Sequence, residues 1–149
     1  MTRFAVDGID CAGKTTFADR LGELLGASRL SVDDFLRPRE ERYARGELSG
    51  EGYYLDSHDH ARFRDAVIAA GEPVVADGIF LQRPELNDLW DVRIWLDVAF
   101  DVALGRALVR DAATMDDPRT RYEQRYWPGQ RLYLEEVDPR GRADIVVAA

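Results

Sequence analysis

The chain has 149 residues, of which 46% are hydrophobic and 32% charged, and its formal net charge is −8 at pH 7. This balance predicts one globular domain over residues 1–149 and argues against nucleic-acid binding, which normally needs a basic face. No apolar run approaches the roughly 20 residues that span a bilayer, no signal peptide is expected, and a single cysteine, Cys11, fits the reducing cytoplasm.

Strands and helices alternate along the chain, which predicts an α/β fold with a parallel sheet covered on both faces. We expect a three-layer sandwich around a five-stranded parallel sheet. The expected strands cover residues 3–7, 28–32, 73–77, 92–98 and 144–147. The expected helices cover residues 14–26, 60–70, 101–113 and much of 119–136, with a helical turn at 84–89 and a loop or broken helix at 36–58.

The stretch Gly-Ile-Asp-Cys-Ala-Gly-Lys-Thr-Thr, residues 8–16, matches the phosphate-loop pattern G-x-x-x-x-G-K-[ST] between an expected strand and an expected helix. Its two glycines let the backbone curl so that successive N–H groups face a phosphate. Lys14 can reach the β- and γ-phosphates, and the Thr15 hydroxyl can ligate Mg²⁺. The motif therefore predicts binding of a nucleoside triphosphate, and the kinase interpretation given below makes it ATP. The residues expected at the nucleotide are Gly8, Asp10, Cys11, Ala12, Gly13, Lys14, Thr15 and Thr16.

Two carboxylates, Asp33 and Asp34, follow the second expected strand in the sequence Ser-Val-Asp-Asp-Phe. In open parallel sheets, ligands bind beyond the carboxyl ends of the strands. A carboxylate there can orient an attacking hydroxyl or accept its proton. The alternative is a solvated pair that caps a following helix. Beside a phosphate loop, we favour catalysis by Asp33 or Asp34.

The third expected strand ends in Asp77, followed by Gly78. An acid at this place typically supports Mg²⁺ beside the loop hydroxyl, whereas the simpler interpretation is an Asp-Gly turn. We favour Asp77 near the metal, through water.

Arginines gather in the last third of the chain. Arg106 and Arg110 are four residues apart on one expected helix and share a face. Guanidinium groups that close over a transferring phosphoryl group stabilise its charge, although a lone surface arginine is usually only solvated. We expect a lid over roughly residues 106–125, with Arg106 and Arg110 in catalysis together with Lys14.

Seven motifs together resemble the uridine kinase family of phosphate-loop kinases, which includes uridine–cytidine kinases and phosphoribulokinase-like enzymes. They are GIDCAGKTT, SVDDF, YYLDSHD, VVADGIFLQRPEL, WLDV, RALVRD and RYWPGQRLYLEEVDPRGRADIVV. The resemblance implies the P-loop NTPase fold of nucleoside kinases and phosphorylation by ATP of a hydroxyl, typically that of a pyrimidine nucleoside such as uridine or cytidine. It further implies that Asp33 is the catalytic carboxylate and that Asp56 holds the ribose hydroxyls. The other residues expected at the acceptor are Asp34, His58, Arg125, Tyr126 and Gln130.

One departure from the family concerns residues 70–73, which connect the helix after the SHD motif directly to the strand that ends in DGIF. In family members a longer stretch lies there and helps to form the base pocket. The acceptor therefore stays open between a nucleoside and another small alcohol, and a non-catalytic ATP-binding protein is the alternative. A nucleotide switch would need the guanine-reading element Asn-Lys-x-Asp, which the chain lacks. His58 and His60 do not share a helix face, so we expect no metal there, and the sequence leaves a homo-oligomer open.

Overall fold

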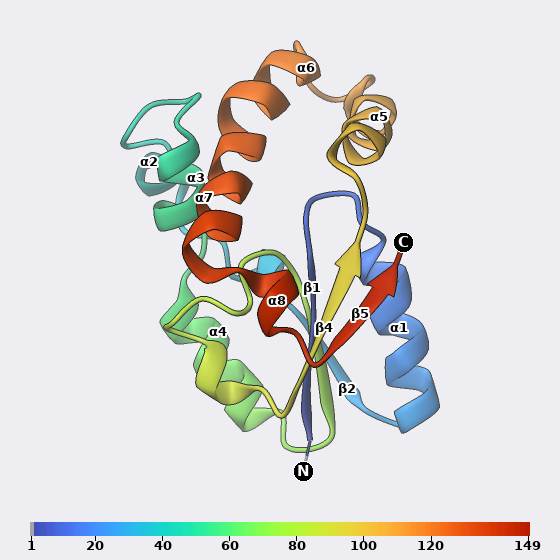
Figure 1. The fold of residues 1–149 in the computed structure, drawn as a ribbon. Helices are drawn as coiled ribbons and strands as arrows, with labels where there is room; N and C mark the ends of the chain where they lie inside the picture. Colours follow the sequence, from blue (N-terminus) through green and yellow to red (C-terminus); the bar gives the residue numbers. More distant parts are fainter. Residues whose placement is uncertain (1) are drawn as a thin grey trace.

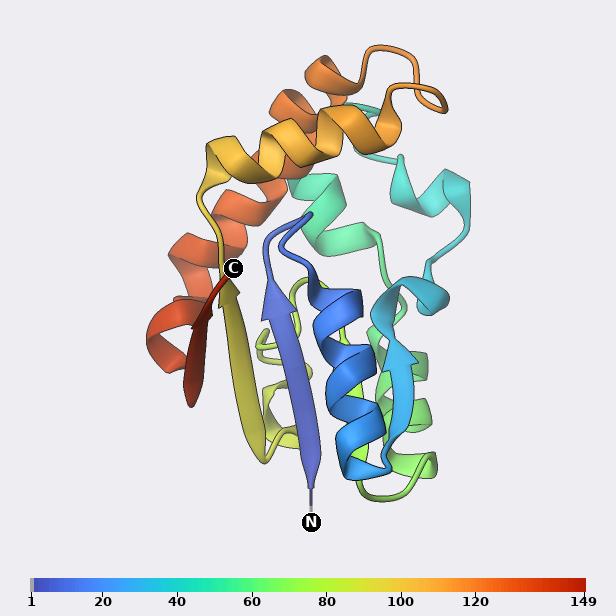
Figure 2. The same ribbon diagram turned by 90° about the vertical axis from the view of Figure 1, so that its right-hand side faces the viewer.

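The computed structural model describes residues 2–149, and within this range five parallel strands form one sheet in the order β2-β3-β1-β4-β5. Figures 1 and 2 show helices on both faces of the sheet and a group of helices beyond the carboxyl ends of its strands. This architecture confirms the expected α/β sandwich. The strands are β1 (Arg3–Gly8), β2 (Ser28–Ser31), β3 (Val74–Asp77), β4 (Val92–Asp97) and β5 (Ile145–Ala148).

The helices agree with the expected ranges to within two residues at most ends, and the segment 36–58 is a broken helix. The helices are α1 (Lys14–Leu25), α2 (Arg39–Arg42), α3 (Gly50–Asp56), α4 (His60–Ala69), α5 (Phe100–Asp111), α6 (Pro118–Arg121), α7 (Trp127–Val137) and α8 (Pro139–Arg142). Short turns complete the chain: η1 (Val32–Phe35), η2 (Asn87–Leu89) and the π-helical η3 (Tyr122–Tyr126). None of the helices in the described range has the length and apolar character needed to cross a membrane.

Alternate residues of each central strand point to opposite faces, so each face packs against its own helices. On one face, Val6 of β1 and Val75 of β3 pack with Ala18 of α1. On the other, Ala5 of β1 packs beneath α4, and farther along the sheet α7 packs against β4. Because both faces are covered, consecutive residues such as Ala5 and Val6 of β1 or Val74 and Val75 of β3 are apolar, whichever face they point to.

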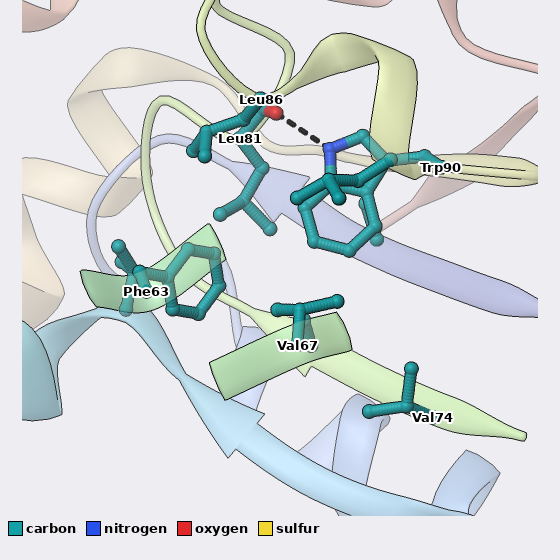
Figure 3. Packing of buried hydrophobic residues seen from close by; sticks show 10 residues of the cluster. Phe63, Val67, Val74, Leu81, Leu86 and Trp90 are labelled. Atoms are coloured by element: carbon teal, nitrogen blue, oxygen red, sulfur yellow. Dashed lines mark hydrogen bonds between the residues drawn. The ribbon is translucent and has the colours of Figure 1, made fainter. Parts of the chain in front are cut away.

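The core beneath α4 is close-packed. Figure 3 shows Phe63 and Val67 of α4 against Val74 of β3, with Leu81 and Trp90 completing the cluster. The Trp90 indole donates a hydrogen bond of 2.7 Å to the carbonyl oxygen of Leu81, so its polar atom is satisfied inside the core. The path from β3 to β4 is thereby fixed under the helix.

The register of the sheet brings the functional ends of three strands to one edge. Asp77, the last residue of β3, lies beside Val6 of β1 and beside Ser31 of β2. The phosphate loop after β1, the turn η1 after β2 and the turn after β3 therefore begin next to one another, below α5 and α7 in Figure 1.

Candidate active site

The phosphate loop borders a cavity of about 370 Å³, which we call the nucleotide cavity. Gly13 takes a left-handed conformation with φ of 86°, and α1 begins at Lys14 without a side-chain cap. The amide groups of its first turn are therefore available to an anion. Gly8 lies beneath the loop, where a Cβ would come within 3.0 Å of the Leu96 carbonyl oxygen. The predicted nucleotide residues that line the cavity are Asp10, Cys11, Ala12, Gly13, Lys14, Thr15 and Thr16.

Thr15 and Asp77 meet on the floor of the nucleotide cavity. The Thr15 hydroxyl donates to Asp77 Oδ2 at 3.3 Å, and Arg29 Nη2 donates to Oδ1 at 3.1 Å. Burial raises the pKa of Asp77, while Arg29 and Thr15 act in the opposite direction. A hydroxyl and a carboxylate beside a phosphate site are hard oxygen donors and fit Mg²⁺, which keeps several waters in such sites. Sequence reasoning missed Arg29, although a charged residue in a short strand could have drawn attention to it.

A second cavity of about 250 Å³, which we call the acceptor cavity, adjoins the first. Both cavities are lined by Asp10, Asp33 and Arg110, so they meet at these side chains. The residues that line only the acceptor cavity are Leu36, Arg42, Tyr43, Tyr53, Ser57, His58, Asp111, Met115, Arg125 and Tyr126. Four of the predicted residues, Asp33, His58, Arg125 and Tyr126, thus line one cavity, and their roles stay predictions.

Asp33 lies in η1, and its carboxylate contacts the buried ring of His58, with 3.1 Å between Asp33 Oδ1 and His58 Nε2. This hydrogen bond is the main reason why the pKa of Asp33 is held below its ordinary value, and the positive charge of Lys14 adds to the effect. Asp33 is therefore ionised at neutral pH and can accept a hydrogen bond from a hydroxyl. Its exposed neighbour Asp34 borders neither cavity.

The two arginines of α5 already contact the phosphate loop. Arg106 Nη1 donates to the carbonyl oxygen of Cys11 at 3.0 Å. Arg110 spans the Asp10 carboxylate with two bonds of 3.1 Å and also contacts Asp111 at 2.9 Å. The structure therefore places two cations at the rim of the nucleotide cavity, and their role in a closing lid stays a prediction.

The next arginines of the expected lid behave differently. Arg119 pairs with Glu123 on the surface at 3.1 Å. Arg121 donates to the hydroxyls of Tyr43 at 2.6 Å and Tyr126 at 3.3 Å. The contacts of Arg121 join two tyrosines of the acceptor-cavity wall, and neither Arg119 nor Arg121 lines the nucleotide cavity.

Helix α7 supports the phosphate loop from behind. Gln130 Oε1 accepts a hydrogen bond of 2.6 Å from the Asp10 amide, so Gln130 contacts the loop and lines neither cavity. One turn later, Tyr133 donates to the carboxylate of Asp7, which also accepts from the Gly8 amide at 2.9 Å. Asp7 is fully buried, and this burial raises its pKa to about 6. An acid inside an apolar strand was the sequence signal that could have revealed it.

Two further predicted acceptor residues take part in internal contacts. Arg125 is 2% exposed and donates to the carbonyl oxygens of Ser49 at 3.1 Å and Arg42 at 3.0 Å. Asp56 pairs with Arg45 at 2.8 Å and lines neither cavity. The structure therefore does not bring Asp56 together with Asp33, and its role at a sugar hydroxyl stays a prediction.

Among the lining residues that the sequence did not reveal are Arg42, Tyr43 and Tyr53. All come from the segment 36–58, whose residues show no steady period. The cavity forms because this segment folds back over the carboxyl edge of the sheet, and only long-range contacts determine that path.

Comparison with known proteins gives a consistent family. The family model described as an AAA domain matches residues 4–125. A uridine kinase of Oceanobacillus iheyensis is 30% identical over 95 residues, which are 59% of this chain and 44% of that protein. A uridine kinase of Aeromonas salmonicida is 31% identical over 96 residues, again 44% of its length. The matched region thus spans less than half of these curated relatives.

Solved structures share the fold at lower identity. A possible uridine kinase from Bacillus stearothermophilus superimposes with a TM-score of 0.74 at 22% identity, covering 97% of this chain and 87% of that one. A gluconokinase from Sinorhizobium meliloti gives a TM-score of 0.63 at 20% identity, covering 99% and 81%. A shikimate kinase from Acinetobacter baumannii in complex with shikimate gives 0.60 at 20% identity, covering 100% and 84%.

Proposed function

The chain belongs to the AAA domain family as a uridine kinase-like phosphate-loop kinase, and on that premise we propose that it transfers the γ-phosphoryl group of ATP to a hydroxyl of a small molecule. One observation carries the proposal. The cavity of the phosphate loop and the cavity of His58 meet at Asp33, Asp10 and Arg110. A carboxylate at the junction of a phosphate site and a second cavity is what in-line transfer to a bound hydroxyl needs.

In the proposed mechanism, the loop amides and Lys14 bind the polyphosphate. Lys14 Nζ donates to the Ile9 carbonyl oxygen at 2.7 Å and would exchange this contact for phosphate oxygens. Mg²⁺, held by Thr15 and through water by Asp77, would neutralise charge on the phosphates when bound. Side chains of this chain would orient the acceptor, accept its proton and stabilise the charge on the transferring group.

Asp33 orients the acceptor hydroxyl and takes its proton as the oxygen bonds to the γ-phosphorus and the bond to the bridging oxygen of ADP breaks. The lowered pKa of Asp33 keeps it ionised for this role. Arg106 and Arg110, already within hydrogen-bond distance of the loop, stabilise the charge on the migrating group. Closure of α5 over the loop would also exclude water, which protects ATP from hydrolysis.

The relatives make a nucleoside such as uridine or cytidine the first acceptor to test. The named activities of the structural neighbours, gluconokinase and shikimate kinase, add small hydroxy acids to the candidates. In this chain α4 connects to β3 through residues 70–73 alone. The acceptor cavity is bounded by the phosphate loop, η1, the segment 36–58, the end of α5 with the residues after it, and η3. A small acceptor suits a cavity of about 250 Å³.

The test is acceptor-dependent ADP formation by the purified protein with ATP and Mg²⁺ across nucleosides, sugars and hydroxy acids. Lys14→Ala is the matched control, because it removes the phosphate contact and leaves the acceptor cavity intact. We expect product with at least one acceptor and none with Lys14→Ala. ATP binding by the wild type without any phosphorylated product would contradict the kinase and support the alternative, a non-catalytic ATP-binding protein.

A further inference from the structure

The part of the acceptor cavity that the nucleotide cavity does not share has two arginines and three tyrosines among its ten lining residues, and its one acid is Asp111, which is paired with Arg110. Arg42, at the end of α2, and Arg125, in η3, both line it together with Tyr43. The chain as a whole carries a net charge of −8, so cations without acidic partners are unexpected in its interior.

Arg125 is a buried cation without a counter-ion. Its side chain is 2% exposed, and the ring centroid of Tyr43 lies 4.3 Å from its guanidinium carbon. Carbonyl oxygens occupy its Nη groups, but its Nε finds no hydrogen-bond acceptor among residues 2–149. Within the same range no carboxylate lies within 4.0 Å of the group. Burying a charge is costly; carbonyl oxygens and the Tyr43 ring offset part of that cost here, and an anion in the cavity would offset more of it.

Arg42 is half-buried and likewise has no acidic partner among residues 2–149. Its Nε donates to the carbonyl oxygen of Arg37 at 2.8 Å, and over the described part of the chain it forms no ion pair. Arg37, beside this wall, also forms no ion pair in the described part of the chain and donates to the His58 carbonyl oxygen, whereas two other arginines nearby do have an acidic partner. Arg39 and Arg121 share Glu47 at 3.7 and 3.6 Å.

We infer that the acceptor carries an anionic group, a carboxylate or a phosphate, which binds at Arg42 and Arg125 while its hydroxyl faces Asp33. This rests on the proposed kinase function, and it narrows the acceptor to small hydroxy compounds with a negative charge. Planar guanidinium groups match the geometry of carboxylates and phosphates and bind both through paired hydrogen bonds. Between the two ends, the rings of Tyr53 and Tyr126 offer a wall for the carbon skeleton.

The test compares matched acceptors that differ in the anion. The pairs are glycerol with D-glycerate, glycerol with glycerol 3-phosphate, and uridine with uridine 3′-monophosphate, in which the 5′-hydroxyl is kept. We expect kcat/KM to favour at least one anionic member by about 10-fold or more, the size of one charge-assisted contact. The carboxylate and phosphate arms distinguish the two kinds of anion.

The variant Arg42→Gln should remove most of this preference, mainly through a higher KM for the anionic member, and Arg42→Lys should restore part of it. Arg131→Gln is the matched control, because Arg131 pairs with Glu135 on the surface of α7, outside the cavity. Arg125→Gln is the second variant. It also removes bonds to the segment 42–49, so its folding is checked by thermal unfolding first.

Two results would overturn the inference and leave the kinase standing: higher kcat/KM for the neutral members, or an anionic preference that Arg42→Gln leaves unchanged. If no acceptor is phosphorylated, the proposed function fails and binding decides the inference. Each acceptor is then added to wild type and Arg42→Gln in a thermal-shift measurement. Because the phosphate loop binds anions in both proteins, only a difference between them counts. Stabilisation of the wild type alone supports the anion site, and equal shifts reject it.

Discussion

The ring of His58 and the carboxylate of Asp33 meet at 3.1 Å, although they come from elements 25 residues apart. The bond joins the turn after β2 to the start of the segment that leads into α4. It lowers the pKa of Asp33 and fixes the direction of its carboxylate at the junction of the two cavities. The charge and the orientation of the Asp33 carboxylate can each be tested by a substitution, of Asp33 itself and of His58.

Replacing Asp33 with Asn should abolish transfer and leave nucleotide binding intact. The loss of a positioned base typically costs on the order of 10²–10⁴ in rate, whereas Lys14 and the loop amides are untouched. The turnover rate tests the loss of transfer, and the ATP dissociation constant, measured on the same preparation, tests whether nucleotide binding is intact. Asp34→Asn is the matched substitution one residue away. Loss of transfer in Asp34→Asn alone would reverse the assignment.

Replacing His58 with Gln should move the acidic limb of the pH–rate profile to higher pH. His58 is the main cause of the lowered pKa of Asp33, so without it Asp33 becomes protonated at a higher pH and the base is lost earlier on acidification. The profile of kcat/KM for wild type and variant measures the shift. His60→Gln is the control, because burial already lowers the pKa of His60 to about 3 and keeps it neutral. If the acidic limb of the profile stays at the same pH in His58→Gln, His58 does not control the pKa of the catalytic base.

Replacing Arg106 or Arg110 with Ala should reduce kcat more than it weakens ATP binding. Both side chains reach the loop from α5, so they act where charge develops, and removal of one such donor typically costs about 10²–10³ in kcat. Steady-state kinetics with an ATP titration separates the two effects. Arg119→Ala, on the surface beyond the loop contacts, serves as control. A change in ATP affinity alone would make these arginines binding residues only.

The buried Asp7 should give the protein a stability component that is lost as pH rises. Its pKa is about 6 in the folded chain and 3.8 as the ordinary value, so the folded state binds more protons between these limits. The contribution is therefore complete below about pH 4 and decreases as pH rises to about 6, by on the order of 3 kcal/mol. Urea unfolding between pH 4 and 8 measures it. In Asp7→Asn this slope should disappear, and an identical slope in both proteins would place the titration elsewhere.

Much of the sheet and the phosphate loop could be predicted from the sequence. Short apolar runs such as Val74–Asp77 locate the strands, and the loop motif between Gly8 and Lys14 is local in sequence. Asp33 and Asp77 follow directly, because parallel strands bring their carboxyl ends to the same edge. These features depend on spacing within a few residues.

The acceptor wall could not be predicted, because its contacts join distant parts of the chain. Arg125 is held by carbonyl oxygens 76 and 83 residues earlier, and Gln130 contacts an amide 120 residues earlier. The family resemblance indicates that such residues belong to the site. It does not indicate whether their side chains contact the ligand or the protein backbone. Gln130 and Asp56 are the examples, since both were expected at the acceptor and both are engaged elsewhere.

Arg125 of η3 binds the segment 42–49 through three main-chain carbonyl oxygens. They belong to Arg42, Gly46 and Ser49, and no side chain of the segment accepts a hydrogen bond from Arg125. Every residue type supplies such an oxygen, so this anchor does not depend on which side chains the segment carries. We therefore expect the segment to keep its path when its cavity-lining side chains, Arg42 and Tyr43, are exchanged. Libraries confined to it offer a way to redirect the choice of alcohol while the triphosphate machinery stays as it is.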